Sequence, residues 1–254
     1  MKAALIPPKG LYNTAVASDY HLALAQITQP AYLDFYESLP GTDFVIMDNG
    51  AAEDATVTDK ELYEAAFHMN VNEIVIPDVM LDAEQTYSRA KVWWSEWHKL
   101  LPPDLTVMVV VQGRTVDECK TMIQRYRREF PDATLALPRH LVTTLFKSAR
   151  CKLVNHIKDF YGEVPVHLLG THPAWPREVL HMGLHHSWVR GIDSSLPYNY
   201  TLAGVALDAE NAYPTISRPD GYFTQDYSDV DYNLLGHNIN TFLRWAHGTE
   251  GTQS

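Results

Sequence analysis

Cysteine and long apolar runs are both scarce in this sequence. Among 254 residues only Cys119 and Cys151 are cysteines, and they form no CxxC pair. This excludes a disulfide framework and a zinc site built on thiolates. No 18 apolar residues run together, and the first apolar run is too short for the core of a signal peptide. We therefore expect a soluble, cytoplasmic protein with no membrane partner and two buried thiols.

Positive charge is scarce as well. The chain has 20 Lys and Arg residues against 31 Asp and Glu residues, a formal net charge of -11 at pH 7. Such a surface repels phosphate, which argues against a protein that coats nucleic acid, so any contact with a polynucleotide has to be local. We interpret the two basic stretches, 124–130 and 146–152, as solvated helix faces.

Short apolar runs rich in β-formers alternate with longer segments of helical period, and no low-complexity linker divides the chain. This alternation predicts βα units around a parallel sheet. The predicted strands are 3–6, 44–47, 73–76, 106–111, 134–137, 164–169 and 188–192. Their spacing of about 25 to 35 residues favours a (β/α)8 TIM-type barrel, formed as one α/β domain over residues 1–254.

The eighth strand has no clear place in the sequence. Residues 198–227 are rich in Asn, Pro, Gly and Tyr and show no periodicity, so the eighth strand cannot be placed there and an irregular one is left open. A final helix is predicted at 229–245. Thr115 and Asp82, each followed three residues later by Glu or Gln, predict helix starts. Gly162 and Gly183 predict helix ends.

Polar groups follow six of the predicted strands, where a barrel carries its chemistry. They are Asp48-Asn49-Gly50, Pro77-Asp78, Gln112-Gly113, Pro138-Arg139-His140, Gly170-Thr171-His172 and Asp193-Ser194-Ser195. Asp, Asn and Ser in such places serve equally well as helix caps or turn residues. Gln112 is different, because Gln is a poor helix cap. Its amide can, however, donate hydrogen bonds to a purine edge and accept them from it.

Three of these groups, Asp48, Asp78 and Asp193, are carboxylates from different strands. We expect them to converge on one pocket, where repulsion and burial separate their pKa values. Two carboxylates suit cleavage of a glycosidic bond, since one can form a sugar ester while the other handles the leaving group.

Five segments together resemble one family. IMDNGA, EIVIPD, VVVQG, HLLG and GIDSSLP, in this order between Asp48 and Pro197, resemble the strand ends of the tRNA-guanine transglycosylases and of their viral relatives that insert 7-deazaguanines into DNA. The resemblance implies a glycosyltransferase, such as one of bacteriophage origin acting in the host cytoplasm. It implies exchange of guanine in DNA for a base such as 7-cyano-7-deazaguanine, without a cofactor. Its partners would be a flipped or single-stranded guanine nucleotide and the free base.

The resemblance also assigns roles to individual residues. It makes Asp193 the nucleophile and Asp48 the general acid/base. The base-binding residues that it implies are Asp78, Gln112, Gly113, Asn49, Gly170 and, through its strand backbone, Leu135.

Two departures from the family pattern matter. The aromatic residue that stacks on the base falls on Ala52 here, and Trp175, His172 and Tyr198 are the candidates to replace it. The zinc site of three Cys and one His in the tRNA enzymes is lacking, which argues against a tRNA substrate and favours the compact, DNA-modifying viral branch.

Histidines and tryptophans suggest two further sites, neither of which we predict. His181 and His185 have i, i+4 spacing, but there is no HExxH motif and Gly183 interrupts the helix, so no metal site is expected. The three tryptophans at 93, 94 and 97 have helical spacing and are interpreted as packing residues.

Two other functions remain open. One is a nucleoside-level deoxyribosyltransferase or hydrolase, which the acidic charge favours. The other is a non-catalytic, transglycosylase-like partner subunit, against which the presence of both Asp48 and Asp193 argues. Association into a homo-oligomer is open too.

Overall fold

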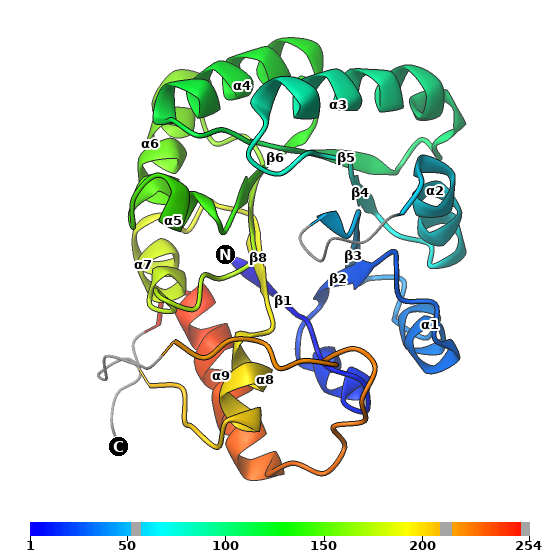
Figure 1. Cartoon of the computed structure of the whole chain (residues 1–254), viewed down its shortest axis with the longest axis vertical. Helices are drawn as coiled ribbons and strands as arrows, with labels where there is room; N and C mark the ends of the chain where they lie inside the picture. Colours follow the sequence, from blue (N-terminus) through cyan, green and yellow to red (C-terminus); the bar gives the residue numbers. More distant parts are fainter. Residues whose placement is uncertain (52–56, 209–214, 250–254) are drawn as a thin grey trace. The chain divides into compact units, whose positions relative to one another are not determined.

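The computed structural model describes residues 1–51, 57–208 and 215–249 (Figure 1). Eight strands form one sheet in the order β1-β8-β7-β6-β5-β4-β3-β2. The pairs β1–β8, β3–β4, β4–β5 and β5–β6 are parallel, and helices alternate with the strands. This is a (β/α)8 TIM-type barrel fold, and the predicted fold class is confirmed.

Contacts group the chain into two compact units, which are described separately below. The first unit comprises Met1–His21 and Leu168–Ser254, and the second comprises Leu22–His167. The elements of the first unit are β1 (Lys2–Leu5), the 3-10 helix η1 (Tyr12–Ala17), α7 (Glu178–His185), β8 (Gly191–Ser194), α8 (Leu196–Leu202) and α9 (Tyr232–Ala246). Strands β2 (Tyr20–Leu24) and β7 (Val166–Leu169) each contain one of the boundaries.

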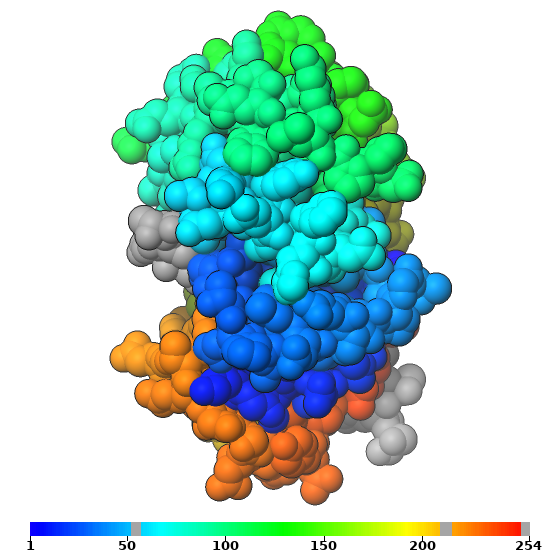
Figure 2. Space-filling view, turned by 90° about the vertical axis from the view of Figure 1, so that its right-hand side faces the viewer, coloured from blue at the N-terminus to red at the C-terminus, as the bar shows by residue number. Residues whose placement is uncertain are grey.

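The second unit contains the remaining elements. Its strands are β3 (Phe44–Asp48), β4 (Glu73–Val75), β5 (Thr106–Val110) and β6 (Thr134–Pro138). Its helices are α1 (Pro30–Glu37), α2 (Asp59–His68), α3 (Ala83–Trp97), η3 (His98–Leu100), α4 (Val116–Glu129), α5 (Leu141–Thr144) and α6 (Ala149–Tyr161). In Figure 1, α3 and α4 lie side by side along one side of β5 and β6. Figure 2 shows the outer surface of this unit, from α1 in blue through α2 in cyan to α3 in blue-green.

The seven predicted strands are present, with ends that differ by at most a few residues. The eighth strand, which the sequence left unplaced, is β2, Tyr20–Leu24. The start of the segment 198–227 belongs to helix α8. All five residues of β2 are buried, so polar and apolar residues do not alternate along it as they do in a half-buried strand. In addition, only the short helix η1 separates β2 from β1.

The predicted helix starts are confirmed, because the side chains of Thr115 and Asp82 accept hydrogen bonds from the backbones of Glu118 and Gln85. Gly162 follows α6 with a φ of 78°, as expected of a helix end. Gly183, in contrast, does not end a helix.

Gly183 lies inside α7, which continues to His185. A Cβ atom at this position would lie 2.2 Å from the carbonyl oxygen of Trp245 in α9. The glycine therefore allows α7 and α9 to approach closely, and the prediction of a helix end there is wrong.

Other sequence predictions can be compared with the structure as well. Cys119 and Cys151 are free and buried, as expected. The tryptophans at 93, 94 and 97 pack, with Trp93 fully buried and the other two against aromatic rings. The stretch 146–152 is not simply a solvated face, since Arg150 is buried and donates to the carbonyl oxygen of Leu137. Across the described residues, no helix combines the length and hydropathy needed to cross a membrane.

Candidate functional site

Three predicted base-binding residues of the second unit form one hydrogen-bonded cluster. Asn49 follows β3, Asp78 follows β4 and Gln112 follows β5. Asn49 Nδ2 donates to Asp78 Oδ1 at 2.8 Å, and Gln112 Nε2 donates to Asp78 Oδ2 at 2.6 Å. All three side chains are buried. Each carboxylate oxygen of Asp78 therefore accepts one amide hydrogen and has lone pairs left for further donors.

A neighbouring backbone segment fixes the orientation of the Gln112 amide. Its Oε1 accepts a hydrogen bond of 3.0 Å from the N–H of Leu81, so the NH2 group must face Asp78. Leu81 has a φ of 61°, which is unfavourable for a residue with a Cβ atom. Backbone strain of this kind persists only where the surroundings hold it, and here Gln112 and the Arg114 side chain both bond Leu81.

Asn49 acts on Asp78 and on the backbone around it. Its Nδ2 donates to both Asp78 Oδ1 and the carbonyl oxygen of Ile76, which uses both amide hydrogens. Its Oδ1 accepts from the N–H of Ala51. Asn49 is thus placed to orient the carboxylate, with no hydrogen left to donate to a ligand.

The pKa of Asp78 is raised above its ordinary value of 3.8, chiefly because burial disfavours the charged carboxylate. The hydrogen bonds from Asn49 and Gln112, and the positive charge of Arg89, act in the opposite direction. Desolvation of Asp78 is thus partly offset by the two side-chain amides, by Arg89 and by a backbone hydrogen bond, all of which favour the anion.

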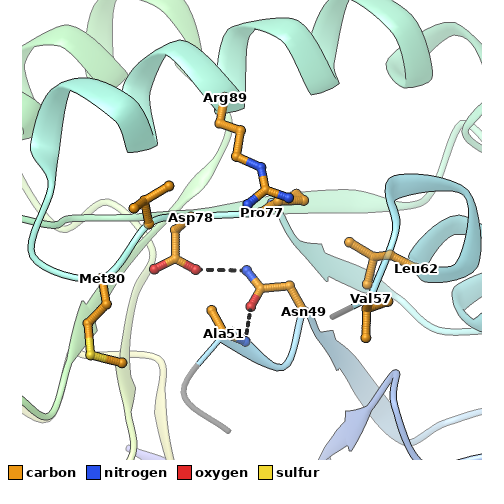
Figure 3. A pocket seen from close by; sticks show the side chains of 9 residues that line it. Asn49, Ala51, Val57, Leu62, Pro77, Asp78, Met80 and Arg89 are labelled. Carbon is orange, nitrogen blue, oxygen red and sulfur yellow. Dashed lines mark hydrogen bonds between the residues drawn. The ribbon is translucent and has the colours of Figure 1, made fainter. Parts of the chain in front are cut away.

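A cavity of about 300 Å³ lies beside Asp78 within the second unit. Its lining combines Asn49, Asp78 and Arg89 with apolar side chains that include Val57, Leu62 and Met80 (Figure 3). Arg89 extends from α3 toward Pro77 and Asp78. The volume is at the lower end of the range for small-molecule sites, and apolar walls with few polar groups are typical of them.

Asp48 is the last residue of β3 and directly precedes Asn49. It is half-buried, and its Oδ2 accepts a hydrogen bond of 3.2 Å from the N–H of Gly50. Its position at a strand end agrees with the sequence analysis.

The first unit contains the other predicted carboxylate, Asp193, which lies in β8 and is buried. Its Oδ1 accepts a hydrogen bond of 3.0 Å from the backbone N–H of Gly170. Gly170 directly follows β7 and has a φ of 71°, a conformation that favours glycine. The structure thus joins Asp193 and Gly170, while convergence of Asp193 with Asp48 and Asp78 stays a prediction.

Gly113 and Leu135 have structural roles that the sequence analysis did not consider. A Cβ atom at Gly113 would lie 2.9 Å from the Sγ atom of Cys119, so glycine permits β5 to meet the start of α4. The N–H of Leu135 donates to the carbonyl oxygen of Pro165, and its side chain is fully buried.

The residues considered for stacking on the base differ in burial. Ala52 lies outside the described residues. Among the candidate replacements, Tyr198 is fully buried and its hydroxyl bonds Thr14 Oγ1, so its ring is part of the core. His172 and Trp175 are only partly buried.

Sequence analysis missed two residues near Asp78, namely Leu81 and Arg89. Neither has a sequence signal, because the strain at Leu81 depends on backbone conformation and Arg89 is one of several charged residues on α3.

His140, after β6, has a pKa lowered from 6.5 to about 4, first by burial and then by Arg150 and Arg139. It is therefore neutral at physiological pH.

The chain was also compared with known proteins. No protein-family model matches it, and no curated protein matches it.

Proposed function

We propose that this protein is a base-exchange glycosyltransferase that replaces guanine in DNA by a 7-deazaguanine such as 7-cyano-7-deazaguanine. The observation that carries the proposal is the Asn49–Asp78–Gln112 cluster beside an apolar-walled cavity. Five motifs in family order support the same activity.

The cluster offers the hydrogen-bonding groups that guanine requires. Asp78 would accept hydrogen bonds from the N1 and exocyclic amino hydrogens of guanine, using the lone pairs that Asn49 and Gln112 leave free. The second hydrogen on Gln112 Nε2 would donate to O6. Adenine presents an acceptor at N1 and a donor at C6, so it would meet the wrong partner at each position.

Asp193 is the proposed nucleophile. Its anion would stabilise the oxocarbenium-like transition state and then bond to C1′ of the target nucleotide, forming a sugar ester as the bond to guanine breaks. The hydrogen bond from the backbone N–H of Gly170 to Oδ1 helps to orient the carboxylate for this attack.

Asp48 is the proposed acid/base. In its protonated form it gives its proton to the departing guanine, and its carboxylate then takes the N9 proton of the incoming 7-deazaguanine. That base attacks C1′ and releases Asp193, so two inversions retain the stereochemistry. The old glycosidic bond supplies the energy of the new one, and no cofactor is consumed.

DNA as the substrate requires the target nucleotide to be flipped out or single-stranded, because a stacked base cannot enter a pocket. The net charge of -11 favours a second candidate function, exchange or hydrolysis at the level of the free nucleoside. A non-catalytic subunit is the third alternative.

One experiment separates these functions. The protein is incubated with DNA, tRNA or deoxyguanosine together with candidate 7-deazaguanines, and the nucleosides are then identified by mass spectrometry. We expect a 7-deazaguanine nucleoside in DNA alone. Exchange only in deoxyguanosine would select the second candidate, and no exchange with any acceptor would leave the non-catalytic role.

A further inference from the structure

A tight turn lies between β4 and α3, directly after Asp78. The N–H of Asp82 donates to the carbonyl oxygen of Val79 at 3.1 Å, which closes a four-residue turn with Met80 and Leu81 in its middle. Leu81, the third residue of this turn, has a φ of 61°. Glycine is the usual residue at such a place, because a residue with a Cβ atom is strained there. The turn therefore needs contacts that hold Leu81 in its conformation.

The segment after β5 supplies these contacts through two side chains. The N–H of Leu81 donates to Gln112 Oε1 at 3.0 Å, and the carbonyl oxygen of Leu81 accepts from Arg114 Nε at 3.1 Å. The two bonds lie on either side of the Leu81 Cα atom. Together they oppose rotation about both backbone dihedrals of this residue.

Arg114 reaches Leu81 from a fixed stretch of backbone. The N–H of Arg114 donates to Glu118 Oε2 at 2.7 Å, and the N–H of Glu118 donates to Thr115 Oγ1 at the start of α4. The Arg114 side chain is exposed, and the bond to Glu118 uses only its backbone. Replacement of this side chain should therefore leave the start of α4 intact.

The other end of the turn is held by α3. Thr86 Oγ1 donates to the carbonyl oxygen of Val79 and accepts from its N–H, both at 2.9 Å. Val79 directly follows Asp78, so the backbone next to the carboxylate is fixed independently of Arg114. A loss of Arg114 should thus act through Leu81 and Gln112.

We propose that Arg114 is a positioning residue for the recognition of guanine, an inference that rests on the proposed reading of the base by Asp78 and Gln112. Arg114 holds Leu81 in its strained conformation and thereby keeps the Leu81 N–H aimed at Gln112 Oε1. Without that bond the Gln112 amide is free to turn over, and its oxygen would then face the Asp78 carboxylate. The hydrogen-bond pattern offered to guanine would be lost in that orientation.

Calorimetric binding of free guanine tests this role in a double-mutant cycle of Arg114→Gln and Leu81→Gly. Arg114→Gln should weaken binding about threefold to tenfold, as expected for the loss of one hydrogen bond. In the Leu81→Gly background the positive φ carries no strain, so the same substitution should weaken binding by less than about twofold. Arg128→Gln, exposed on α4, removes the same charge and should bind as the wild type does. Equal losses in the two backgrounds would overturn the proposal.

Hydrogen exchange of the Leu81 amide measures the same contact without any ligand. We expect this amide to exchange at least about tenfold faster in Arg114→Gln than in the wild type, and at the wild-type rate in Arg128→Gln. Unchanged exchange in Arg114→Gln would overturn the proposal. Absence of guanine binding in the wild type would reject the proposed function, whereas faster exchange in Arg114→Gln would still support the hold of Arg114 on Leu81 and Gln112.

Discussion

Gln112 Nε2 donates to Asp78 Oδ2 at 2.6 Å while Gln112 Oε1 accepts from the N–H of Leu81 at 3.0 Å. This pair of bonds connects the side chain after β5 to the segment after β4, and it leaves the Gln112 amide a single orientation. The carboxylate of Asp78 is thus oriented before any ligand arrives. Such preorganisation reduces the entropy lost on binding.

Removal of the Asp78 carboxylate should weaken binding of free guanine. A charge-assisted hydrogen bond of this kind contributes about 1.5 to 3 kcal/mol, so Asp78→Ala should lower the affinity about tenfold to a hundredfold. Asp104→Ala, at an exposed position before β5, is the control and should bind normally. Calorimetry measures both, and unchanged affinity in Asp78→Ala would exclude Asp78 as a reader of the base.

Binding of guanine should depend on pH through Asp78. Only the anion accepts both guanine hydrogens, so affinity should fall as the pH drops through the pKa of Asp78, which lies above the ordinary 3.8. The hydrogen bond from Asn49 lowers this pKa, so its loss in Asn49→Ala should raise the pKa further. We expect the midpoint of the affinity profile to move to higher pH in this variant. A midpoint that stays in place or moves to lower pH would show that Asn49 does not tune Asp78.

His140 should make the fold sensitive to acid. Its folded pKa is about 4 against an ordinary 6.5, so the unfolded chain binds more protons between these values. The stability from neutral His140 is present above pH 6.5 and is lost as the pH falls toward 4. With an allowance for partial exposure the effect is about 2 kcal/mol. Urea unfolding at several pH values should show that the free energy of unfolding falls less between pH 6.5 and 4 in His140→Gln than in the exposed control His247→Gln. Equal falls in the two variants would contradict this role of His140.

The regular part of the fold could be predicted from the sequence, and its exceptions have physical reasons. Alternation of apolar strands with capped helices indicated seven strands, and Thr115 and Asp82 marked helix starts correctly. Strand β2 was missed because a fully buried strand has no alternation. Gly183 was misread because its role, contact with Trp245, depends on a helix distant in sequence.

The candidate site was predicted only as a set of positions. The sequence predicted that Asp78 and Gln112 follow two consecutive parallel strands. Because the C-terminal ends of such strands lie at one face of a barrel, it also predicted that the two residues are near each other. Their direct hydrogen bonds, and the use of both Asn49 hydrogens by Ile76 and Asp78, required coordinates. The position of Arg89 at the cavity could not be predicted, because a charged residue in a helix is normally interpreted as part of the solvated surface.

The covalent intermediate on Asp193 is the most direct test of the proposed activity. Wild-type protein is incubated with guanine-containing DNA without the incoming base, and the mixture is analysed by denaturing electrophoresis and by peptide mass mapping. We predict a protein–DNA adduct with the sugar on Asp193, released on addition of a 7-deazaguanine. Asp193→Asn should bind the DNA, form no adduct and lose exchange by several orders of magnitude, because a neutral amide cannot stabilise the oxocarbenium-like transition state. Near-normal exchange by Asp193→Asn, or an adduct on another residue, would contradict the assignment of the nucleophile.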